Sequence, residues 1–234
     1  MADDKKLPAN PTSEDVEAFL EQLARTPAPQ AGTGRGRLIF AMDATASREP
    51  TWDRACQLQG EMFKETAALG GLEVQLVYYR GFGECMASKW AASADQLLEA
   101  MTGVTCLGGH TQIARVLRHA INETLQRKVN AIVFVGDCME EDIDALCELA
   151  GRLGLLGVPI FVFQEGNDPV ATRALPQIAR LSGGAWCQFD TGSAQQLRAL
   201  LSAVAVYAAG GRPALENYGK RYGGAVLRIA RQVK

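Results

Sequence analysis

The strongest signal for the fold of this chain is the segment Leu38-Ile39-Phe40-Ala41-Met42-Asp43-Ala44-Thr45-Ala46-Ser47. An apolar run ends on a carboxylate, and hydroxyl groups follow two and four residues later. A short, continuous apolar run bounded by polar residues is typical of a strand that is buried on both faces. The loop after it carries one charged and two neutral oxygen donors, which are the ligands that Mg²⁺ prefers. The stretch therefore predicts a buried strand with a metal-binding loop at its carboxyl end.

Two further segments carry donors of the same kind. They are Gly108-Gly109-His110-Thr111, which opens a helical pattern, and Ala131-Ile132-Val133-Phe134-Val135-Gly136-Asp137, a second apolar run that ends on Asp. Asp, Ser and Thr are also favoured helix caps and turn residues, so each segment alone is weak evidence for a metal. Their order favours a metal site, because two strand ends and a Gly-rich helix start are expected at the same edge of a sheet.

In this order the residues resemble the metal-ion-dependent adhesion site of the von Willebrand factor type A family, which is written Asp-x-Ser-x-Ser, then Thr, then Asp. The resemblance covers roughly Arg37 to Tyr207. Carried over residue by residue, it implies five metal ligands, which are Asp43, Thr45, Ser47, Thr111 and Asp137. Thr45 stands where Ser is commoner, and its hydroxyl keeps the acceptor. The resemblance implies Mg²⁺ as the ion, with Mn²⁺ or Ca²⁺ as alternatives, and a protein partner that presents an acidic residue to it.

The rest of the chain alternates between strand and helix patterns. Strands are expected at 38–42, 72–79, 85–90, 131–135, 158–163 and 185–189, and helices at 50–69, 93–101, 111–126, 142–153, 170–181 and 193–208. The turn Gly81-Phe82-Gly83 predicts an antiparallel hairpin. The pattern indicates an α/β fold, a doubly wound, mostly parallel six-stranded sheet with one antiparallel edge strand and helices on both faces. In the family's strand order, Asp43 and Asp137 end neighbouring strands at the topological switch point.

The sequence divides into three predicted parts. Residues 1–36 contain a short amphipathic helix and a Pro/Gly linker, residues 37–209 form the von Willebrand factor type A domain, and residues 210–234 form a basic C-terminal tail that is expected to be helical. Each terminal helix either packs on the domain or docks a partner.

The composition excludes several classes of protein. With 234 residues, 47% of them hydrophobic, and a net charge of −2, the chain is ordinary for a globular protein and has no basic excess for nucleic acid. No apolar stretch is long enough to span a bilayer, and the first residues lack the apolar core of a secretory signal. We therefore expect a cytoplasmic protein, similar to bacterial single-domain members of the family.

Six cysteines are scattered without a Cys-x-x-Cys pair, which predicts free thiols in a reducing compartment. Cys106 and Cys138 stand beside the predicted ligand loops. With His110 they offer a softer metal site or a redox switch at the rim, whereas the simpler interpretation is that they pack under the loops.

Three residues are candidates for a partner-binding rim around the metal. Trp52, near the start of the helix after Ser47, is either an exposed anchor or a core residue. His110 either contacts a ligand or partner, or bonds to nearby backbone. Glu140 begins an acidic cluster, with Glu141, Asp142 and Asp144, that either attracts cations and basic partners or complements a helix N-terminus.

These features favour a divalent-metal-dependent protein–protein interaction module without catalysis. By fold-level analogy it would serve an ATPase, chaperone-like or stress-response assembly. The alternative is a metal-dependent hydrolase or phosphotransferase with Asp43 as the nucleophile. The nearest such pattern is Asp-x-Asp-x-Thr of the haloacid dehalogenases, but Thr45 stands where the second Asp would act as general acid and base. The sequence has two histidines and no Ser-His-Asp or Cys-His arrangement, so binding is favoured.

Overall fold

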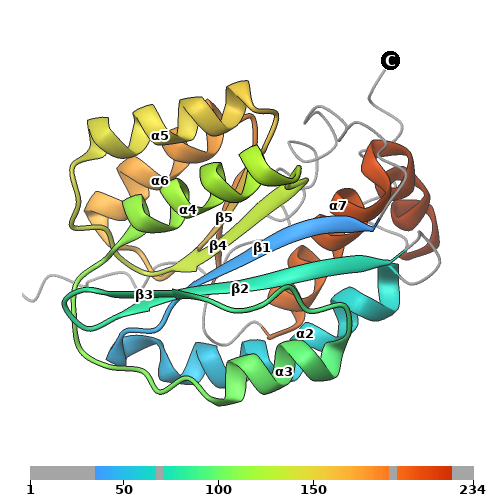
Figure 1. Cartoon of the computed structure of the whole chain (residues 1–234), viewed down its shortest axis with the longest axis horizontal. Coiled ribbons are helices and arrows are strands. Elements are labelled where there is room, and N and C mark those ends of the chain that lie inside the picture. Colours follow the sequence, from blue (N-terminus) through green and yellow to red (C-terminus); the bar gives the residue numbers. More distant parts are fainter. Residues whose placement is uncertain (1–34, 67–70, 190–193, 223–234) are drawn as a thin grey trace, which may run out of the picture.

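The computed structural model describes residues 35–66, 71–189 and 194–222. Its strands are β1 (Gly36–Asp43), β2 (Leu72–Arg80), β3 (Glu84–Ala87), β4 (Ala131–Gly136), β5 (Ile160–Glu165) and β6 (Trp186–Phe189). They form one sheet in the order β3-β2-β1-β4-β5-β6, in which only β2 and β3 pair antiparallel. The predicted α/β sheet with one antiparallel edge strand is confirmed (Figure 1).

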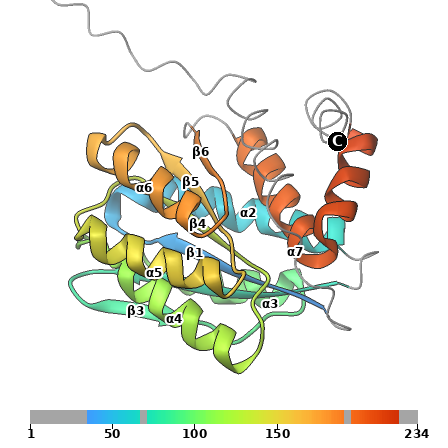
Figure 2. The same cartoon turned by 90° about the horizontal axis from the view of Figure 1, so that it is seen from above.

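The helices form two layers. They are α2 (Glu49–Thr66), α3 (Ala94–Thr102), α4 (Ile113–Gln126), α5 (Ile143–Leu155), α6 (Pro169–Leu181) and α7 (Ala194–Tyr222), and a 3-10 turn, η1 (Ala46–Arg48), precedes α2. Side chains of α2, α3 and α7 share one buried core with the sheet, and those of α4, α5 and α6 share the other. The two layers lie on opposite faces of the sheet (Figures 1 and 2).

Strand β1 shows why the strands of this sheet appear in the sequence as continuous apolar runs. Every residue of β1 is buried. Leu38, Phe40 and Met42 pack in the core with α2, α3 and α7, while Ile39 and Ala41 face the core with α4, α5 and α6. Successive side chains of a strand point to opposite faces, so a strand between two helix layers has to be apolar throughout.

Helix α7 differs from the expectation. It continues past residue 208 to Tyr222, and a kink at Gly211, whose φ is 66°, joins two helical segments. Leu215, beyond the kink, is buried in the core. The predicted boundary between residues 209 and 210 therefore falls inside this helix, and the division into three parts stays a prediction. The helix predicted within 1–36 and the last part of the predicted tail, 223–234, lie outside the described residues.

In the ranges that the structure describes, no helix is both long enough and apolar enough to cross a membrane.

Candidate metal centre

The candidate metal centre lies at the carboxyl ends of β1 and β4. Strand β1 has β2 on one side and β4 on the other, so the chain changes direction across the sheet at this point. Open parallel sheets bind ligands at such a switch point. Asp43 is the last residue of β1 and Asp137 directly follows β4, so the fold brings the two carboxylates to the same edge.

The loop after β1 carries three of the five predicted ligands. Asp43 is fully buried: its Oδ1 accepts a hydrogen bond from the Thr45 backbone N–H (2.7 Å), and its Oδ2 accepts one from the Tyr79 hydroxyl (3.1 Å). The hydroxyl oxygens of Thr45 and Ser47 lie 3.4 Å apart. The bond from Asp43 to the backbone two residues on is a local turn typical of Asp, and it folds the loop so that the two hydroxyls lie together.

Asp137 joins the loop after β4 to the loop after β1. Its Oδ2 accepts a hydrogen bond from the Ser47 hydroxyl at 2.8 Å. Its Oδ1 is buried and has no hydrogen-bond partner within the described residues. A buried carboxylate oxygen without a partner costs free energy, and a bound cation would remove that cost. Two hydroxyls and two carboxylates, one of which has an unsatisfied buried oxygen, therefore fit a divalent cation.

Thr111 lies beside this group on a third loop. Its hydroxyl accepts a hydrogen bond from the Glu140 backbone N–H (3.1 Å), and its own N–H donates to Glu140 Oε2 (3.0 Å). These reciprocal bonds tie the loop before α4 to the loop after β4. The structure thus links Ser47 directly to Asp137, and places Thr111 next to the loop that carries Asp137; the metal-binding role of the predicted ligands stays a prediction.

The acidic cluster after β4 caps the N-termini of two helices. Glu141 accepts hydrogen bonds from the backbone of Ile113 (2.5 Å) and Ala114 (2.9 Å) at the start of α4. Asp142 accepts one from the Ala145 backbone at the start of α5. Carboxylates at these positions satisfy unpaired N–H groups and complement the helix dipole. The helix-capping interpretation is therefore correct for Glu141 and Asp142, although Glu141 caps a helix other than the one that follows it.

His110 and Glu140 lie on exposed loops beside Thr111. His110 Nδ1 is 3.2 Å from Glu140 Oε2, and the His110 ring meets the ring of Phe82 edge to face at 5.1 Å between centroids. Phe82 is 83% exposed and was not predicted, because an aromatic residue between two glycines reads as part of a turn. The partner-binding role of His110 and Glu140 stays a prediction.

Trp52 does not lie on the rim. It is 3% exposed, its indole N–H donates to the Met101 backbone oxygen at 3.1 Å, and its ring packs edge to face on Tyr78. The hypothesis of an exposed anchor is wrong, and Trp52 is a core residue. The physical reason is that it points from the first turns of α2 toward the sheet and α3.

A buried cation, Arg48, lies beneath the site and was not predicted from the sequence. It is 1% exposed and forms an ion pair with Glu165 at the end of β5, and the Thr51 hydroxyl donates to the same carboxylate at 2.5 Å. Burial lowers the pKa of Arg48, while the carboxylates of Asp137 and Asp43 act in the opposite direction. Arg is almost never buried unless it is paired, and this partner is 117 residues away in the sequence.

Two carboxylates and a thiol, those of Asp43, Asp137 and Cys138, lie close together at the candidate centre. Burial, and then the charge of Asp137, raises the pKa of Asp43, whereas its hydrogen bonds from Thr45 lower it. Burial, and then the carboxylate of Asp137, raises the pKa of the Cys138 thiol to about 12. Both shifts disfavour the negatively charged forms of Asp43 and Cys138. A divalent cation bound between them would favour those forms instead.

Solved structures similar to this chain include von Willebrand factor type A domains. The von Willebrand factor type A protein from Catenulispora acidiphila is 15% identical with a TM-score of 0.61, over 74% of this chain and 43% of that chain. The SpRpn10 VWA domain is 15% identical with a TM-score of 0.56, over 76% and 97%. Proximal thread matrix protein 1 from the mussel byssus, with a zinc-occupied MIDAS motif, is 17% identical with a TM-score of 0.57, over 74% and 46%. The chain therefore has the von Willebrand factor type A fold, as the sequence predicted.

No family model and no curated protein matches the sequence. The chain spans 43% of the Catenulispora protein and 62% of a similar structure, the D319A mutant of the PilB minor pilin from Streptococcus sanguinis. At these identities the likeness establishes the fold, so the chemistry of the site has to be argued from this chain's own residues.

Proposed function

We propose that this chain is a divalent-metal-dependent protein-interaction module, in which a metal ion between Asp43 and Asp137 binds a carboxylate of a partner protein. The observation that carries the proposal is at Asp137. One of its oxygens accepts from Ser47 at 2.8 Å, and the other is buried without a partner among the described residues. The proposed ligands are Asp43, Thr45, Ser47, Thr111 and Asp137.

The donor set supports Mg²⁺ as one ion for this centre, with Mn²⁺ or Ca²⁺ as alternatives. All five proposed ligands offer oxygen, and only two of them are charged. Mg²⁺ sheds its waters reluctantly, so it would keep open positions and enough positive charge to attract a partner's Asp or Glu. The zinc-occupied MIDAS motif of the mussel protein supports a divalent ion at this kind of site.

We infer that the centre binds and does not catalyse. In the hydrolase alternative Asp43 would attack the substrate, but Asp43 is fully buried and both of its oxygens accept hydrogen bonds. A nucleophile has to reach its target at about 3–3.5 Å. Turnover of a generic phosphoester by the wild type, lost in Asp43→Ala, would overturn this inference.

Thermal unfolding in EDTA, Mg²⁺, Mn²⁺ or Ca²⁺ tests the metal centre. An ion at a hundred times its dissociation constant stabilises the native state by about 2.7 kcal/mol. For a domain of this size the midpoint should rise by roughly 5–10 °C. We expect the rise in the wild type and none in Asp43→Ala; no rise with any of the three ions would contradict a site for these ions.

Capture of a partner tests the interaction. We expect a cytoplasmic protein of an ATPase, chaperone-like or stress-response assembly to bind in Mg²⁺ and to be released by EDTA. Ser47→Ala is the matched variant, because Ser47 is an exposed proposed ligand whose loss leaves the core intact. A partner that binds equally well in EDTA, or equally well to Ser47→Ala, would contradict a metal-bridged carboxylate.

A further inference from the structure

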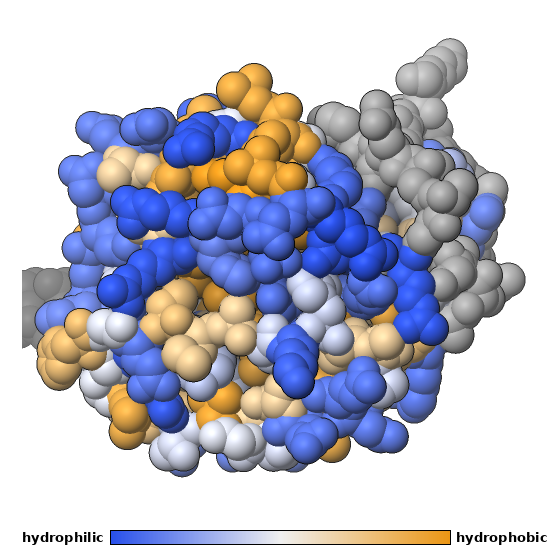
Figure 3. Space-filling view, viewed as in Figure 1, coloured by the Kyte–Doolittle hydropathy of each residue, from blue (hydrophilic) through white to orange (hydrophobic). Residues whose placement is uncertain are grey.

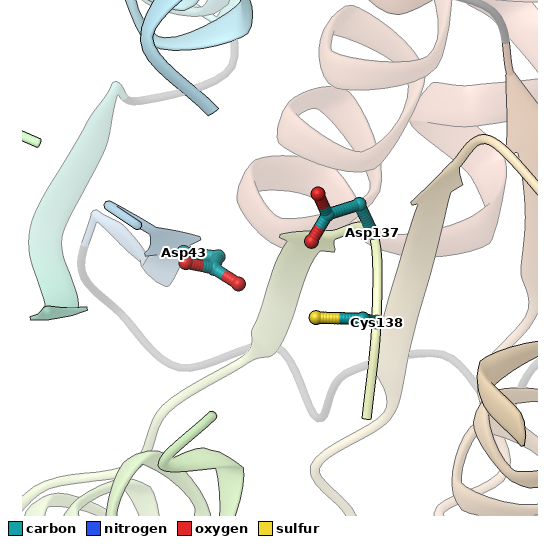
Figure 4. A group of neighbouring side chains, drawn as sticks. All are labelled: Asp43, Asp137 and Cys138. Carbon is teal, nitrogen blue, oxygen red and sulfur yellow. The ribbon is translucent and has the colours of Figure 1, made fainter. Parts of the chain in front are cut away.

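A thiol lies at the same point as the two carboxylates. The sulfur of Cys138 and one carboxylate oxygen each from Asp43 and Asp137 all lie within 4.8 Å of one another. In Figure 4 the side chains of Asp137 and Cys138 extend from the β4 end toward Asp43, which points back at them. The sequence offered Cys138 either as part of a softer metal site or redox switch with Cys106 and His110, or as a residue packed under the loops, whereas the structure groups it with the two aspartates.

We propose that Cys138 is a further ligand of this centre, and that it makes the centre bind a thiophilic divalent ion of the zinc class in preference to Mg²⁺. The inference rests on the proposed function, because it places the ion between the same two carboxylates.

The separations suit an ion of this class. Zinc binds sulfur at about 2.3 Å and carboxylate oxygen at about 2.0–2.2 Å, so tetrahedral ligands stand roughly 3.5 Å apart. Three side-chain atoms within 4.8 Å of one another need to close by only about an ångström to reach that arrangement. Three protein ligands with a fourth position left open is also the arrangement of zinc sites that exchange ligands, and the open position would admit a partner's carboxylate.

Two overlapping ligand sets follow from the hard and soft character of the donors. Mg²⁺ takes oxygen ligands and would leave the thiol of Cys138 unbound. A thiophilic ion would take the sulfur together with Asp43 and Asp137, and the thiol proton would pass to solvent as the sulfur binds. The buried Oδ1 of Asp137 is a free acceptor for either ion within the described residues.

Cobalt(II) is the direct probe, because a cobalt–thiolate bond gives an intense near-ultraviolet charge-transfer absorption that oxygen ligands do not give. We expect this absorption when one equivalent of Co²⁺ is added to the full metal-free chain, and its loss in Cys138→Ser. Cys106→Ser is the matched control, because Cys106 is also half-buried and precedes the Thr111 loop. Absence of the band, or its persistence in Cys138→Ser, would overturn the proposal.

Binding constants give the second readout. Removing even a residue that only supports a metal ligand typically costs 10–100-fold in affinity, so Cys138→Ser should lower Zn²⁺ affinity at least about tenfold. The Mg²⁺ affinity of Cys138→Ala should stay unchanged, because Mg²⁺ does not use the sulfur and alanine adds no oxygen donor. An unchanged Zn²⁺ affinity, or an equal loss for both ions, would contradict a ligand role for Cys138.

The two proposals fail in different ways. If Mg²⁺ stabilises the wild type while Cys138→Ser binds Zn²⁺ as the wild type does, only the role of Cys138 is refuted. If neither Mg²⁺ nor Zn²⁺ changes the unfolding midpoint of the wild type, both proposals are refuted. Cys138→Ala serves as a second variant, and the midpoints of both variants in EDTA show whether the fold is kept.

Discussion

Asp43 places a carboxyl group where no solvent reaches it. Its side chain is fully buried, a second carboxylate lies beside it, and burial raises its pKa. A buried carboxylate costs free energy of folding, and the nearby Arg48 offsets only part of it, because Arg48 pairs directly with Glu165. Its two hydrogen bonds offset part of this cost. In the metal-free protein Asp43 should therefore be a destabilising residue, and a bound cation should offset its cost.

We predict that Asp43→Asn does not destabilise the metal-free protein at pH 7, and that it raises the free energy of unfolding. The amide oxygen of Asn would still accept from the Thr45 backbone, and its NH₂ would donate to the Tyr79 oxygen. The variant should lose the metal response, about 2.7 kcal/mol at a hundred times the dissociation constant. Urea unfolding with EDTA and with Mg²⁺ measures both effects, and a large loss of stability in EDTA would contradict the argument.

The advantage of Asp43→Asn should depend on pH. A carboxyl group whose pKa is raised in the folded state destabilises that state where it is ionised, which is above its folded pKa. As pH falls through the raised pKa toward the ordinary value of 3.8, both states become protonated and the difference between wild type and variant should disappear. Urea unfolding in EDTA at several pH values measures this, and a difference that does not change with pH would refute it.

The ion pair between Arg48 and Glu165 joins the turn before α2 to the end of β5. Both side chains are buried, and Thr51 donates to the same carboxylate. Breaking a buried pair leaves an uncompensated charge, so Glu165→Gln should cost about 3–5 kcal/mol in urea unfolding. The control is Glu61→Gln, which breaks a pair with the exposed Lys64 on the surface of α2 and should cost less than about 1 kcal/mol. Equal costs would refute this account of Arg48.

The loop before α4 depends on a glycine. A Cβ at Gly109 would lie 2.0 Å from the backbone oxygen of Gly81, whereas a Cβ at Gly108 would meet no described atom within 4 Å. Gly109→Ala should therefore push the Thr111 loop away from the β2–β3 turn and weaken Mg²⁺ binding by about tenfold, or about 1.4 kcal/mol. Gly108→Ala, the matched control, should bind Mg²⁺ as the wild type does. Calorimetric titration with Mg²⁺ measures both variants, and equal behaviour would contradict the argument.

The elements that could be predicted are those whose pattern is local. The β1 run is apolar throughout because two helix layers cover it, and Asp43 and Asp137 were found because each follows such a run. The pattern predicts a helix that ends at residue 208, just before Gly210-Gly211, but the chain resumes a helix after a kink at Gly211, with Pro213 near the start of the second segment. A Gly-Gly pair signals a break in a helix and does not say whether the helix resumes.

The parts of the site that could not be predicted depend on distant partners. The sequence gives no sign that Arg48 pairs with Glu165, or that Glu141 caps the start of α4. The exposed-anchor hypothesis for Trp52 was wrong for a related reason. An indole near the start of a helix is buried or exposed according to how the helix packs, and here that depends on Met101 of α3. Side-chain chemistry is local, whereas burial and pairing are set by the whole fold.

Exposed apolar side chains lie at both ends of the sheet, beside the carboxyl ends of its strands and beside their amino ends. Beside the candidate centre, Phe82 is exposed and Leu107 is 45% exposed, and the Leu107 backbone donates to Ala44 in the loop of Asp43 at 3.0 Å. At the opposite end, strong orange in Figure 3 gathers at the ends of α4 and α5, where Leu125 and Leu155 are exposed. Only Phe82 and Leu107 lie beside the proposed metal. Because the residues that contribute most to binding lie at the centre of an interface, we expect this first group to contact the partner.

Phe82 and Leu155 therefore make a matched pair. Leu155, at the end of α5, is 92% exposed, so Phe82→Ser and Leu155→Ser should each change the free energy of unfolding by less than about 0.5 kcal/mol. Phe82→Ser should weaken Mg²⁺-dependent binding of the captured partner by about tenfold or more, because exposed aromatic residues near the centre of an interface contribute most of its energy. Leu155→Ser should bind that partner normally, because it lies at the far end of the sheet. Titration of the purified partner against both variants in Mg²⁺ decides the matter: an equal loss in the two would mean that the interface is not organised around the metal centre.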